Sequence, residues 1–386
     1  MTFAVVSSHP IQYYAPLFRE LARRIDVQVF YLHQVTAHDQ AEAGFDLGFE
    51  WDVDLLSGYE SSFLENAAIR PGLHHFRGVS TPGIAAALKQ GRFRAVLLTG
   101  WHLWGYAQAI MSAKRLGIPV MVRGDSQLQT KRSFAKRATK AVAYPAFLRT
   151  FDAALYVGTR SKDYWRHYLY PGERLFFSPH CVDNAWFAER SSAEAGTTLR
   201  QKLGIAPHTK VLLFAGKLQP FKRPLDVIDA GALLRRNGRD VQLLVAGSGE
   251  LDAAMWQRAD AAGVPLHMLG FQNQSAMPAA YAAADLLVLP SSSETWGLVA
   301  NEALACGTPV VVSDACGCAP DLAADGIAGA TFPTGNVRAL AERLSQLLDQ
   351  PPDNAQIAKK ISRYSLSNAV DGIETAFQAI RRMAPQ

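Results

Sequence analysis

Residues 285–313 of this 386-residue chain read Asp285-Leu-Leu-Val-Leu-Pro-Ser-Ser-Ser-Glu294-Thr-Trp-Gly297-Leu-Val-Ala-Asn-Glu302-Ala-Leu-Ala-Cys-Gly307-Thr-Pro-Val-Val-Val-Ser313. The apolar run 285–289 is typical of a buried strand, and residues 309–313 repeat that pattern after a helical stretch at 298–305. Gly307 closes the predicted helix, as glycine often does just past a helix end. A strand, a helix and a second strand in this order predict a parallel sheet that is covered by helices.

The same alternation of short apolar runs and helical stretches extends through the second half of the chain. Such runs, four to six residues long, are typical of parallel strands that are buried on both faces. Strands are predicted at 210–215, 242–246, 266–269, 285–289 and 309–313, and helices at 224–237, 250–262, 277–283, 298–305 and 336–349. We assign this region to one doubly wound domain, residues 209–355.

The first half has a similar rhythm, with strands predicted at 3–7, 27–32, 95–99, 119–122 and 153–157 and helices at 14–24 and 105–116. Residues 35–75 interrupt it with many aromatic side chains, which indicates an insertion facing a cleft. Residues 191–208 are small and polar, which is typical of a linker. We therefore predict an α/β protein with two doubly wound Rossmann-like domains, 1–190 and 209–355, facing each other across a cleft. Ligands are expected at the carboxyl ends of the strands.

Composition and charge exclude several classes of protein. Hydrophobic residues make up 49% and charged residues 19%, an ordinary globular balance. With 39 Lys+Arg against 34 Asp+Glu, the net charge of +5 argues against dedicated nucleic-acid binding. No apolar run reaches the ~18–20 residues of a membrane-spanning helix. The four cysteines lack paired CxxC spacing, and the start lacks a basic region, so we expect a cytoplasmic protein with reduced thiols and no zinc site.

The stretch quoted above also predicts a binding site. Gly297 opens the helix at 298–305, and the free amides and dipole of its first turn make Gly297–Leu298 a phosphate cradle. Glu294 before the helix and Glu302 within it are expected to point into the same cleft and to bind neighbouring hydroxyls, as in a ribose or a hexose. For an isolated pair, the alternative is a helix-dipole carboxylate and a solvated surface glutamate.

Two further loops follow predicted strands and supply glycines and lysines. Gly216 lets the backbone approach a ligand, and Lys217 and Lys222 can flank a diphosphate. The spacing is not that of a Walker loop. Gly247 and Gly249 form a second glycine loop, in which Asp252 stands where a dinucleotide fingerprint has its third glycine. A lone Gly-x-Gly is weak evidence by itself.

Together these residues resemble the retaining nucleotide-sugar glycosyltransferases of family 4, which have the GT-B fold. Glu294-x7-Glu302 with Gly297, Gly307 and Pro309 matches the E-x7-E signature of that family, and Ala215-Gly-Lys-Leu…Lys222 resembles its G-[RK]-L…K loop. Residues 313–326 resemble the segment that follows. Residues 156–162 and 178–187 resemble two elements of the first domain, with His-Cys in place of Asn-Gly. The resemblance is clearest over 208–335 and is colinear over 1–190.

The resemblance implies a role for each matching residue in donor binding. Glu302 would bind the ribose hydroxyls and Glu294 the hydroxyls of the donor sugar. Lys217, where many relatives have Arg, and Lys222 would hold the diphosphate with the Gly297–Leu298 amides. Phe271 with Gln272 is a candidate nucleobase platform, with a plain core role for Phe271 as the alternative. The donor-binding set is completed by Gly216, Gly247 and Trp296.

For the first domain, the resemblance leaves the group beside the anomeric carbon open. Asp125 occupies the position where the family often carries a histidine, and His102, which also ends a predicted strand, is the other candidate. A structural histidine is the alternative for His102. His9, Gln12 and Tyr13 follow the first strand and are expected on the acceptor side, or else form a packed turn. The resemblance also implies that the C-terminal helix, 356–386, returns to the first domain.

The predicted reaction is transfer of a sugar from a nucleoside diphosphate to an acceptor hydroxyl with retention. Lys217, Lys222 and Glu294 would be catalytic beside Asp125 or His102, because positive charge and amides stabilise the departing diphosphate. No metal or other cofactor is expected, since no cluster has ligand spacing. The donor is expected to be a UDP-sugar, with a GDP-sugar as the alternative. An epimerase or hydrolase acting on the donor, and a non-catalytic nucleotide-sugar-binding protein, remain competing hypotheses.

The acceptor is left open among a glycan, a lipid-linked molecule and a small molecule, as in polysaccharide, glycolipid or glycoconjugate synthesis. Residues 131–149 contain Lys131, Arg132, Lys136, Arg137, Lys140 and Arg149 with interleaved aromatic residues and no acidic residue. This pattern suits peripheral contact with an anionic membrane at its inner face. The alternative is a solvated basic helix face. No nucleic-acid partner is expected.

Overall fold

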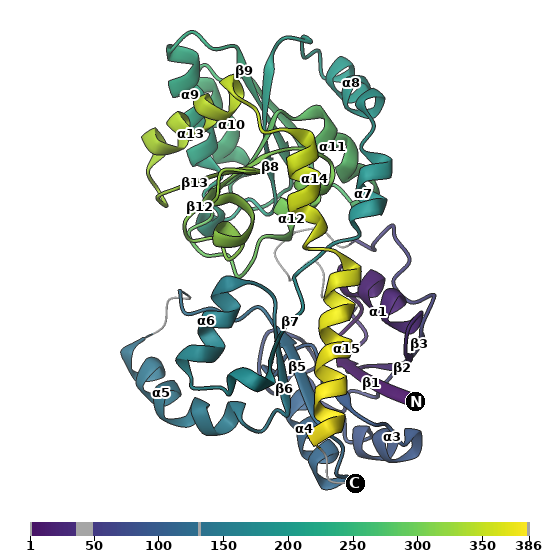
Figure 1. Ribbon diagram of the computed structural model, residues 1–386. Coiled ribbons are helices and arrows are strands. Elements are labelled where there is room, and N and C mark those ends of the chain that lie inside the picture. The colour runs from purple at the N-terminus through teal and green to yellow at the C-terminus, as the bar shows by residue number, and fades with distance from the viewer. Residues whose placement is uncertain (1, 36–48, 130–132, 384–386) are drawn as a thin grey trace. The chain divides into compact units, whose positions relative to one another are not determined.

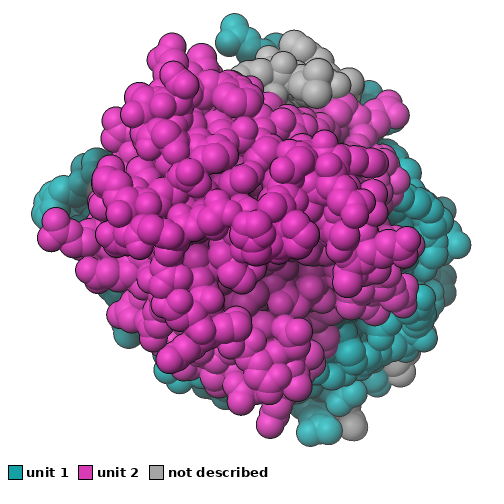
Figure 2. Space-filling view, turned by 90° about the horizontal axis from the view of Figure 1, so that it is seen from above, with its two compact units in different colours: residues 1–39, 54–180, 366–386 teal, residues 40–53, 181–365 magenta. Residues whose placement is uncertain are grey.

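The computed structural model describes residues 2–35, 49–129 and 133–383 (Figure 1). The chain forms two compact units, coloured separately in Figure 2. Unit 1 comprises residues 1–39, 54–180 and 366–386, and unit 2 comprises residues 40–53 and 181–365. Each unit contains its own parallel sheet with helices. The predicted α/β fold with two doubly wound sheets is therefore confirmed.

The sheet of unit 1 has the order β3-β2-β1-β4-β5-β6-β7, and every neighbouring pair is parallel. Its strands are β1 (Thr2–Ser7), β2 (Asp26–Tyr31), β3 (Glu60–Phe63), β4 (Val96–Leu98), β5 (Val120–Gly124), β6 (Ala153–Tyr156) and β7 (Leu175–Phe177). The strand order reverses between β1 and β4. In doubly wound sheets, ligands bind beside the carboxyl ends of strands at such a reversal.

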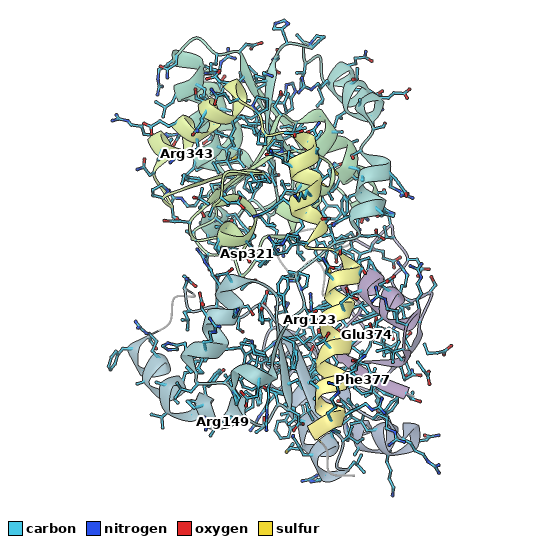
Figure 3. All side chains as sticks on the ribbon, in the orientation of Figure 1. Arg123, Arg149, Asp321, Arg343, Glu374 and Phe377 are labelled. Carbon is cyan, nitrogen blue, oxygen red and sulfur yellow. The ribbon has the colours of Figure 1, made fainter. Side chains whose placement is uncertain are left out.

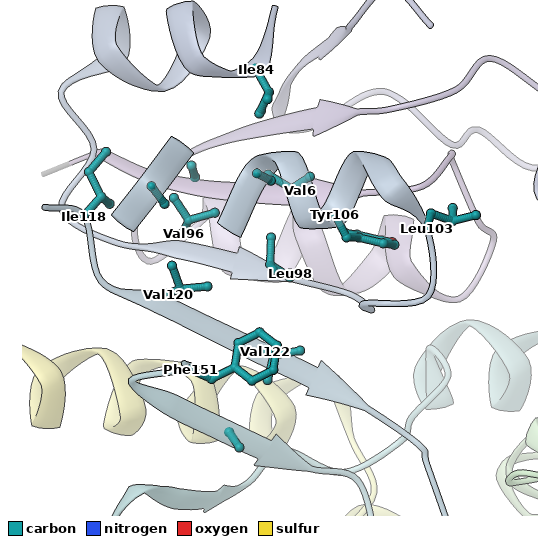
Figure 4. Packing of buried hydrophobic residues seen from close by; sticks show 14 of the residues in the cluster. Val6, Ile84, Val96, Leu98, Leu103, Tyr106, Ile118, Val120, Val122 and Phe151 are labelled. Atoms are coloured by element: carbon teal, nitrogen blue, oxygen red, sulfur yellow. The ribbon is translucent and has the colours of Figure 1, made fainter. Parts of the chain in front are cut away.

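The helices of unit 1 cover this sheet and close its core. They are α1 (Tyr14–Ala22), α3 (Ile84–Gly91), α4 (Trp104–Arg115), α5 (Phe134–Leu148), α6 (Thr159–His167) and α15 (Leu366–Met383), with a 3-10 turn η2 (Gly172–Arg174). Figure 4 shows Val6, Leu98 and Val122 from neighbouring strands packing with Tyr106 and Phe151. Each fully buried side chain of this kind stabilises the fold by about 1.5–3 kcal/mol.

The sheet of unit 2 has the order β10-β9-β8-β11-β12-β13, again with only parallel pairs between these described strands. Its strands are β8 (Lys210–Ala215), β9 (Val241–Ala246), β10 (Leu266–Gly270), β11 (Leu286–Leu289), β12 (Val310–Ser313) and β13 (Gly329–Phe332). The order reverses between β8 and β11. The loops that follow these two strands therefore lie at the reversal point.

The helices of unit 2 are α7 (Asn184–Arg190), α8 (Ala193–Lys202), α9 (Leu225–Arg236), α10 (Asp252–Ala262), α11 (Met277–Ala283), α12 (Leu298–Ala305), α13 (Val337–Asp349) and α14 (Asn354–Ser362). Three short turns of helix accompany them: η3 (Pro220–Lys222), η4 (Gln274–Ala276) and η5 (Ala319–Ala323). The core below the sheet is formed by aliphatic residues of β8, β9, α9 and α13.

The stretch 191–208, predicted as a linker, contains helix α8. Ser192 caps this helix by accepting a hydrogen bond from Ala195 N at 3.1 Å. A side chain at Gly196 would lie 2.4 Å from the Ala282 carbonyl oxygen, so α8 packs closely on α11. Small residues that suggest a linker by composition thus serve a close helix contact. The chain passes from unit 1 to unit 2 after His180, whereas the first domain was predicted to extend to residue 190.

The predicted C-terminal helix is interrupted, because α14 ends at Ser362 and α15 begins at Leu366. Helix α14 packs on α12 within unit 2, whereas α15 belongs to unit 1 and packs on α1, β6 and β7. The Phe377 ring, labelled in Figure 3, lies 5.2 Å from that of Phe3. Glycine at 372 allows α15 to lie close to β7, since a Cβ there would lie 1.9 Å from the Phe177 carbonyl oxygen.

The region 35–75 is only partly irregular. Residues 36–48, including Phe45, lie outside the described residues. Strand β3 pairs with β2 at the sheet edge, which the sequence analysis missed because Glu60-Ser-Ser-Phe63 is mostly polar. Residues 49–53 belong to unit 2, not to unit 1. The insertion is therefore divided between the two units.

Candidate functional site

The predicted donor residues of unit 2 lie on two loops at the β8/β11 reversal. Gly216, Lys217 and Lys222 follow β8, and Glu294 and Gly297 follow β11. The two loops are joined by their backbones, because Ser292 N donates to the Phe221 carbonyl oxygen at 2.7 Å. Residues that are about 70 positions apart in the sequence are thereby brought together, as adjacent parallel strands require.

Lys222 and Glu294 form an ion pair through Nζ and Oε2, and their side chains are 18% and 16% exposed. A partly buried pair of this kind is screened less by salt than a surface pair. Burial and the charge of Lys222 lower the pKa of the neighbouring Lys217. Two ammonium groups therefore lie close together beside one carboxylate, an arrangement that favours an incoming polyanion.

Two glycine loops pack against each other below the lysines. Gly216 N donates to Ala246 O, and Leu218 N donates to Ser248 O, both at 2.9 Å. Gly247 has φ 154°, and a Cβ there would lie 1.9 Å from the Gly216 carbonyl oxygen. Only glycine fits this left-handed position at such a distance. The loops after β8 and β9 therefore pack closely on each other, through backbone hydrogen bonds and glycines without side chains.

Helix α12 begins at the same place. Gly297 stands at its N-cap with φ 102°, and among the described residues no side chain caps the helix. A Cβ at Gly297 would lie 2.6 Å from a methyl of Leu289 and 3.4 Å from Cγ of Glu294. The start of α12, at Leu298, is therefore close to Glu294. Its first-turn amides and dipole favour an anion there.

Two predicted donor residues are more enclosed than the sequence analysis expects. Glu302 is 4% exposed and its Oε2 accepts a hydrogen bond from the Tyr281 hydroxyl at 2.5 Å. Trp296 is 3% exposed, and its indole nitrogen donates to Asn301 Oδ1 at 2.8 Å. The enclosed Trp296 side chain helps to position the loop, and its donor contact stays a prediction.

The segment after β12 supports the loop that carries Glu294. Gly317 N donates to Glu294 O and Cys318 N donates to Trp296 O, both at 3.0 Å. A Cβ at Gly317 would lie 1.8 Å from Thr295 O, so this glycine is needed for the contact. Burial raises the pKa of Cys316 to about 12, and the four cysteines are free thiols. The sequence analysis matched this segment to the family but assigned it no role.

The candidate nucleobase platform has a partner from the first half of the sequence. The rings of Phe271 and Phe49 lie 4.3 Å apart. The neighbouring Asn273 donates to Glu50 O at 2.7 Å, and Ser275 bonds to Asp52. Gln272 donates to Leu269 O at 2.7 Å and so braces its own loop. The aromatic richness of residues 45–63 is a signal in the sequence, but it does not identify Phe271 as the ring that Phe49 contacts.

In unit 1, the predicted acceptor residues lie at the β1/β4 reversal. His9 Nδ1 is 2.9 Å from Ser8 Oγ, and the Tyr106 hydroxyl accepts from Ser8 N at 2.9 Å. Gln12 and Tyr13 are half-buried just before α1. His102 is exposed on the loop after β4. These four predicted residues therefore share one end of the sheet.

Asp125, at the end of β5, acts electrostatically on His102. Although part of the His102 side chain is exposed, desolvation by the groups around its ring lowers its pKa, and the negative charge of Asp125 opposes that shift. The two candidates for the group beside the anomeric carbon are thus neighbours. His102 is neutral at neutral pH when its pKa lies below the ordinary value of about 6.5.

Sequence reasoning missed Arg123, a buried cation next to this pair. Its side chain, labelled in Figure 3, is 1% exposed and donates to Ser178 Oγ at 3.0 Å and Pro179 O at 2.6 Å. Its guanidinium lies 5.7 Å from the Tyr14 ring centroid. Burial raises the pKa of Tyr14 to about 12, and burial together with Arg123 lowers the pKa of His180. A buried arginine in an apolar strand is the only signal for it in the sequence.

Metal binding and membrane crossing each require a recognisable arrangement of residues. Within residues 2–35, 49–129 and 133–383, no three His, Cys, Asp or Glu side chains are grouped so that they could hold a metal ion. Over the same residues, no helix combines the length and hydropathy that crossing a bilayer requires.

The sequence of this chain is similar to those of known glycosyltransferases. Residues 196–364 match the family described as glycosyl transferases group 1. D-inositol 3-phosphate glycosyltransferase of Mycolicibacterium smegmatis is 34% identical over 187 residues, which cover 46% of this chain and 42% of the relative. The enzyme of that name from Jonesia denitrificans is 34% identical over 262 residues, 60% of this chain and 61% of the relative. The chain thus matches about half the length of these relatives.

Among solved structures, Anabaena HepE in complex with UDP is similar over 98% of this chain and 100% of its own. The TM-score is 0.74 and the sequence identity is 18%. This likeness establishes the fold, and the two doubly wound sheets are those of the GT-B class that the motifs predicted.

Proposed function

We propose that this chain, whose residues 196–364 match the family described as glycosyl transferases group 1, moves a sugar from a nucleoside diphosphate to an acceptor hydroxyl. The observation that carries this proposal is the Lys222–Glu294 ion pair beside the start of α12. It combines the two kinds of group that a nucleotide sugar needs, a cation for its diphosphate and a carboxylate for its sugar hydroxyls. We further propose that the configuration is retained and that no metal is required.

We propose that donor binding breaks the Lys222–Glu294 ion pair and gives each side chain a new partner on the donor. The diphosphate draws Lys222 away from Glu294 and also meets Lys217 and the first amides of α12. Glu294 then accepts hydrogen bonds from hydroxyls of the sugar. Glu302, whose carboxylate is oriented by the Tyr281 hydroxyl, is assigned to the ribose. Phe271 is assigned to the base, with Gly216 and Gly247 giving the backbone room.

The chemical step breaks the bond between the anomeric carbon and the diphosphate oxygen, which keeps the electron pair. The acceptor hydroxyl attacks the face that the diphosphate leaves, and its proton passes to the departing phosphate oxygen. Lys217 and Lys222 stabilise the negative charge that grows on the phosphate, which is usually the largest catalytic contribution. Asp125 and His102 are assigned to orienting the acceptor and the anomeric centre, with His9, Gln12 and Tyr13 as further acceptor-side groups.

The donor is proposed to be a UDP-sugar, with a GDP-sugar as the alternative, because a protein with this fold is known in complex with UDP. The acceptor is proposed to be a polyol, glycan or lipid-linked molecule. The names of the relatives favour a phosphorylated polyol among small molecules.

Release of nucleoside diphosphate from UDP- and GDP-sugars, with and without candidate acceptors, tests the proposal. Release that depends on an acceptor supports transfer. Isomerised or hydrolysed donor in its absence would favour an epimerase or hydrolase, and tight binding without turnover would favour a sensor. Analysis of the product linkage by NMR then tests retention, and activity in the presence of a chelator tests metal independence.

Peripheral membrane contact through α5 is a further part of the proposal. Phe134 and Val142 are 85% and 83% exposed, while Lys140 lies with its ammonium 4.1 Å from the Tyr144 ring centroid. Exposed apolar and basic side chains on one helix suit an anionic lipid surface. Lys131 and Arg132 lie outside the described residues. Co-sedimentation with anionic but not neutral vesicles, lost in Phe134→Ala/Val142→Ala, is expected; equal sedimentation of the variant contradicts it.

A further inference from the structure

A pocket of about 640 Å³ lies in unit 1, outside the residues assigned so far. It is formed by the segment 67–80 and by the start of α4. Its lining residues are Ala67, Ala68, Ile69, Arg70, His75, Phe76, Arg77, Ser80 and Trp104. A volume between about 300 and 1,000 Å³ is typical of pockets for small ligands. The pocket therefore has the size of a binding site.

The pocket wall is fixed by one asparagine. Asn66 Oδ1 accepts hydrogen bonds from Ala68 N at 3.1 Å and Ser80 N at 2.9 Å. Its Nδ2 donates to Gly78 O at 3.0 Å and lies 3.1 Å from His33 Nδ1. Both ends of the 67–80 segment are thus tied to a single side chain, and the segment keeps a defined shape.

The start of α4 supplies the opposite wall. Trp104 N donates to Phe76 O at 2.7 Å, and the two aromatic rings are 6.1 Å apart. Gly105 permits this approach, because a Cβ there would lie 2.9 Å from Val79 Cγ1. The loop before α4 also carries His102. The pocket is therefore built on the same loop as a residue assigned to the acceptor.

Charge in the pocket has one sign. Arg70, His75 and Arg77 line it, and none of these described lining residues is acidic. Within the described part of the chain, neither Arg70 nor Arg77 forms an ion pair. The apolar remainder includes Ile69, which is wholly exposed, and Phe76, which is about half exposed. An exposed apolar surface is typical of a binding site, and the arginines beside it can form charge-assisted hydrogen bonds with an anionic group.

We propose that this pocket binds the acceptor, and that the acceptor carries an anionic group such as a phosphate directly beside an apolar portion. Arg70 and Arg77 hold the anion through charge-assisted hydrogen bonds. Phe76, Trp104 and Ile69 cover the apolar portion. The inference rests on the proposed function for its acceptor role, whereas the ligand chemistry follows from the pocket alone.

Direct binding tests the ligand chemistry with soluble probes. Calorimetry on the full chain compares n-octyl phosphate, kept below its micelle concentration, with octanol and with inorganic phosphate. Octyl phosphate should bind at least about tenfold more tightly than either fragment, because both halves of the pocket are then occupied. Equal affinity for octyl phosphate and phosphate, or no binding of octyl phosphate, overturns the proposal.

Variants assign the binding to this pocket. Arg70→Gln/Arg77→Gln should weaken octyl phosphate about tenfold or more and leave octanol unchanged. Trp104→Ala should weaken both probes. His74→Gln, a neighbouring exposed residue outside the lining, is the matched control and should change neither. Unchanged octyl phosphate affinity in the arginine double variant contradicts the proposal, and thermal unfolding followed by circular dichroism checks that every variant is folded.

The acceptor role is tested separately from the donor site. With an acceptor found in the turnover assay, the arginine double variant should raise the acceptor KM about tenfold and leave kcat and the donor KM unchanged. An unchanged acceptor KM overturns the acceptor role. If wild-type protein binds no nucleotide, the proposed function fails, while the octyl phosphate measurement still decides the chemistry of the pocket.

Discussion

Lys222 is the residue on which donor turnover should depend most. It is half of the Lys222–Glu294 ion pair, and the proposed reaction needs its charge on the departing phosphate. We expect Lys222→Ala to lower kcat/KM for the donor by about 100-fold or more, as removal of one stabilising donor does elsewhere. Lys210→Ala is the matched control, since Lys210 stands at the other end of β8 and pairs with Asp285 at 3.0 Å. Similar rates for both variants would rule out this role.

Glu294 should have opposite effects on nucleotide binding and on transfer. In the free protein it holds Lys222, so a diphosphate must compete with it. Glu294→Gln removes that competition, and we expect UDP to bind several-fold more tightly, while transfer from a UDP-sugar falls at least about tenfold because a sugar contact is lost. Titration calorimetry with UDP and a steady-state assay measure the two effects. Weaker UDP binding in this variant would show that the pair does not compete with the ligand.

Lys217 should make donor binding depend on pH. Burial and Lys222 lower its pKa, so it loses its proton at lower pH than an ordinary lysine. A bound diphosphate favours the protonated form, and UDP binding should therefore take up protons on the alkaline side. The affinity should fall as the pH rises through the lowered pKa. Calorimetry in two buffers of different ionisation enthalpy measures the uptake, which Lys217→Arg should abolish because arginine stays charged. Equal uptake in that variant contradicts the assignment to Lys217.

At the scale of elements, the packed glycine loops after β8 and β9 form the floor of the site. Gly247→Ala would place a Cβ 1.9 Å from Gly216 O, in a backbone region that only glycine adopts easily. We expect it to lower the free energy of unfolding by at least about 2 kcal/mol and to weaken UDP binding. Gly263→Ala, also at positive φ but with open space around it, should cost only about 1–2 kcal/mol and leave UDP binding intact. Denaturant unfolding and calorimetry check both, and equal UDP affinities would contradict the account.

Elements with a regular apolar pattern could be predicted from the sequence, and those with a polar or small-residue composition could not. The buried strands β8, β9, β11 and β12 contain almost only apolar residues, and these short continuous apolar runs identify them in the sequence. Edge strand β3 is mostly polar, and its residues are half-buried or exposed, so it contains no apolar run that would identify it. Helix α8 contains Gly196, which indicates a linker by composition but is required by packing on α11.

The site was predictable where its residues follow strands and unpredictable where it depends on distant pairing. Lys222 and Glu294 lie on the loops that follow the adjacent strands β8 and β11, so the topology brings them to the same end of the sheet. The pairing of Phe49 with Phe271 and the enclosure of Arg123 depend on contacts between segments far apart in the chain. Local sequence patterns carry no information on such contacts.

In the whole molecule, the two points of strand-order reversal carry different kinds of side chain. Unit 2 presents lysines, backbone amides and Glu294 at the β8/β11 reversal, and unit 1 presents His9, His102 and Asp125 at the ends of its own central strands. Under the proposed function, the reversal in unit 2 would bind the donor and the reversal in unit 1 would bind the acceptor.

A crystal structure of the chain with UDP tests the central claim most directly. The account predicts the diphosphate at the β8/β11 reversal, within hydrogen-bonding distance of Lys217 Nζ, Lys222 Nζ and the first amides of α12, with Glu294 released from Lys222. A diphosphate bound elsewhere, or one bound here while Lys222 stays paired with Glu294, would contradict it.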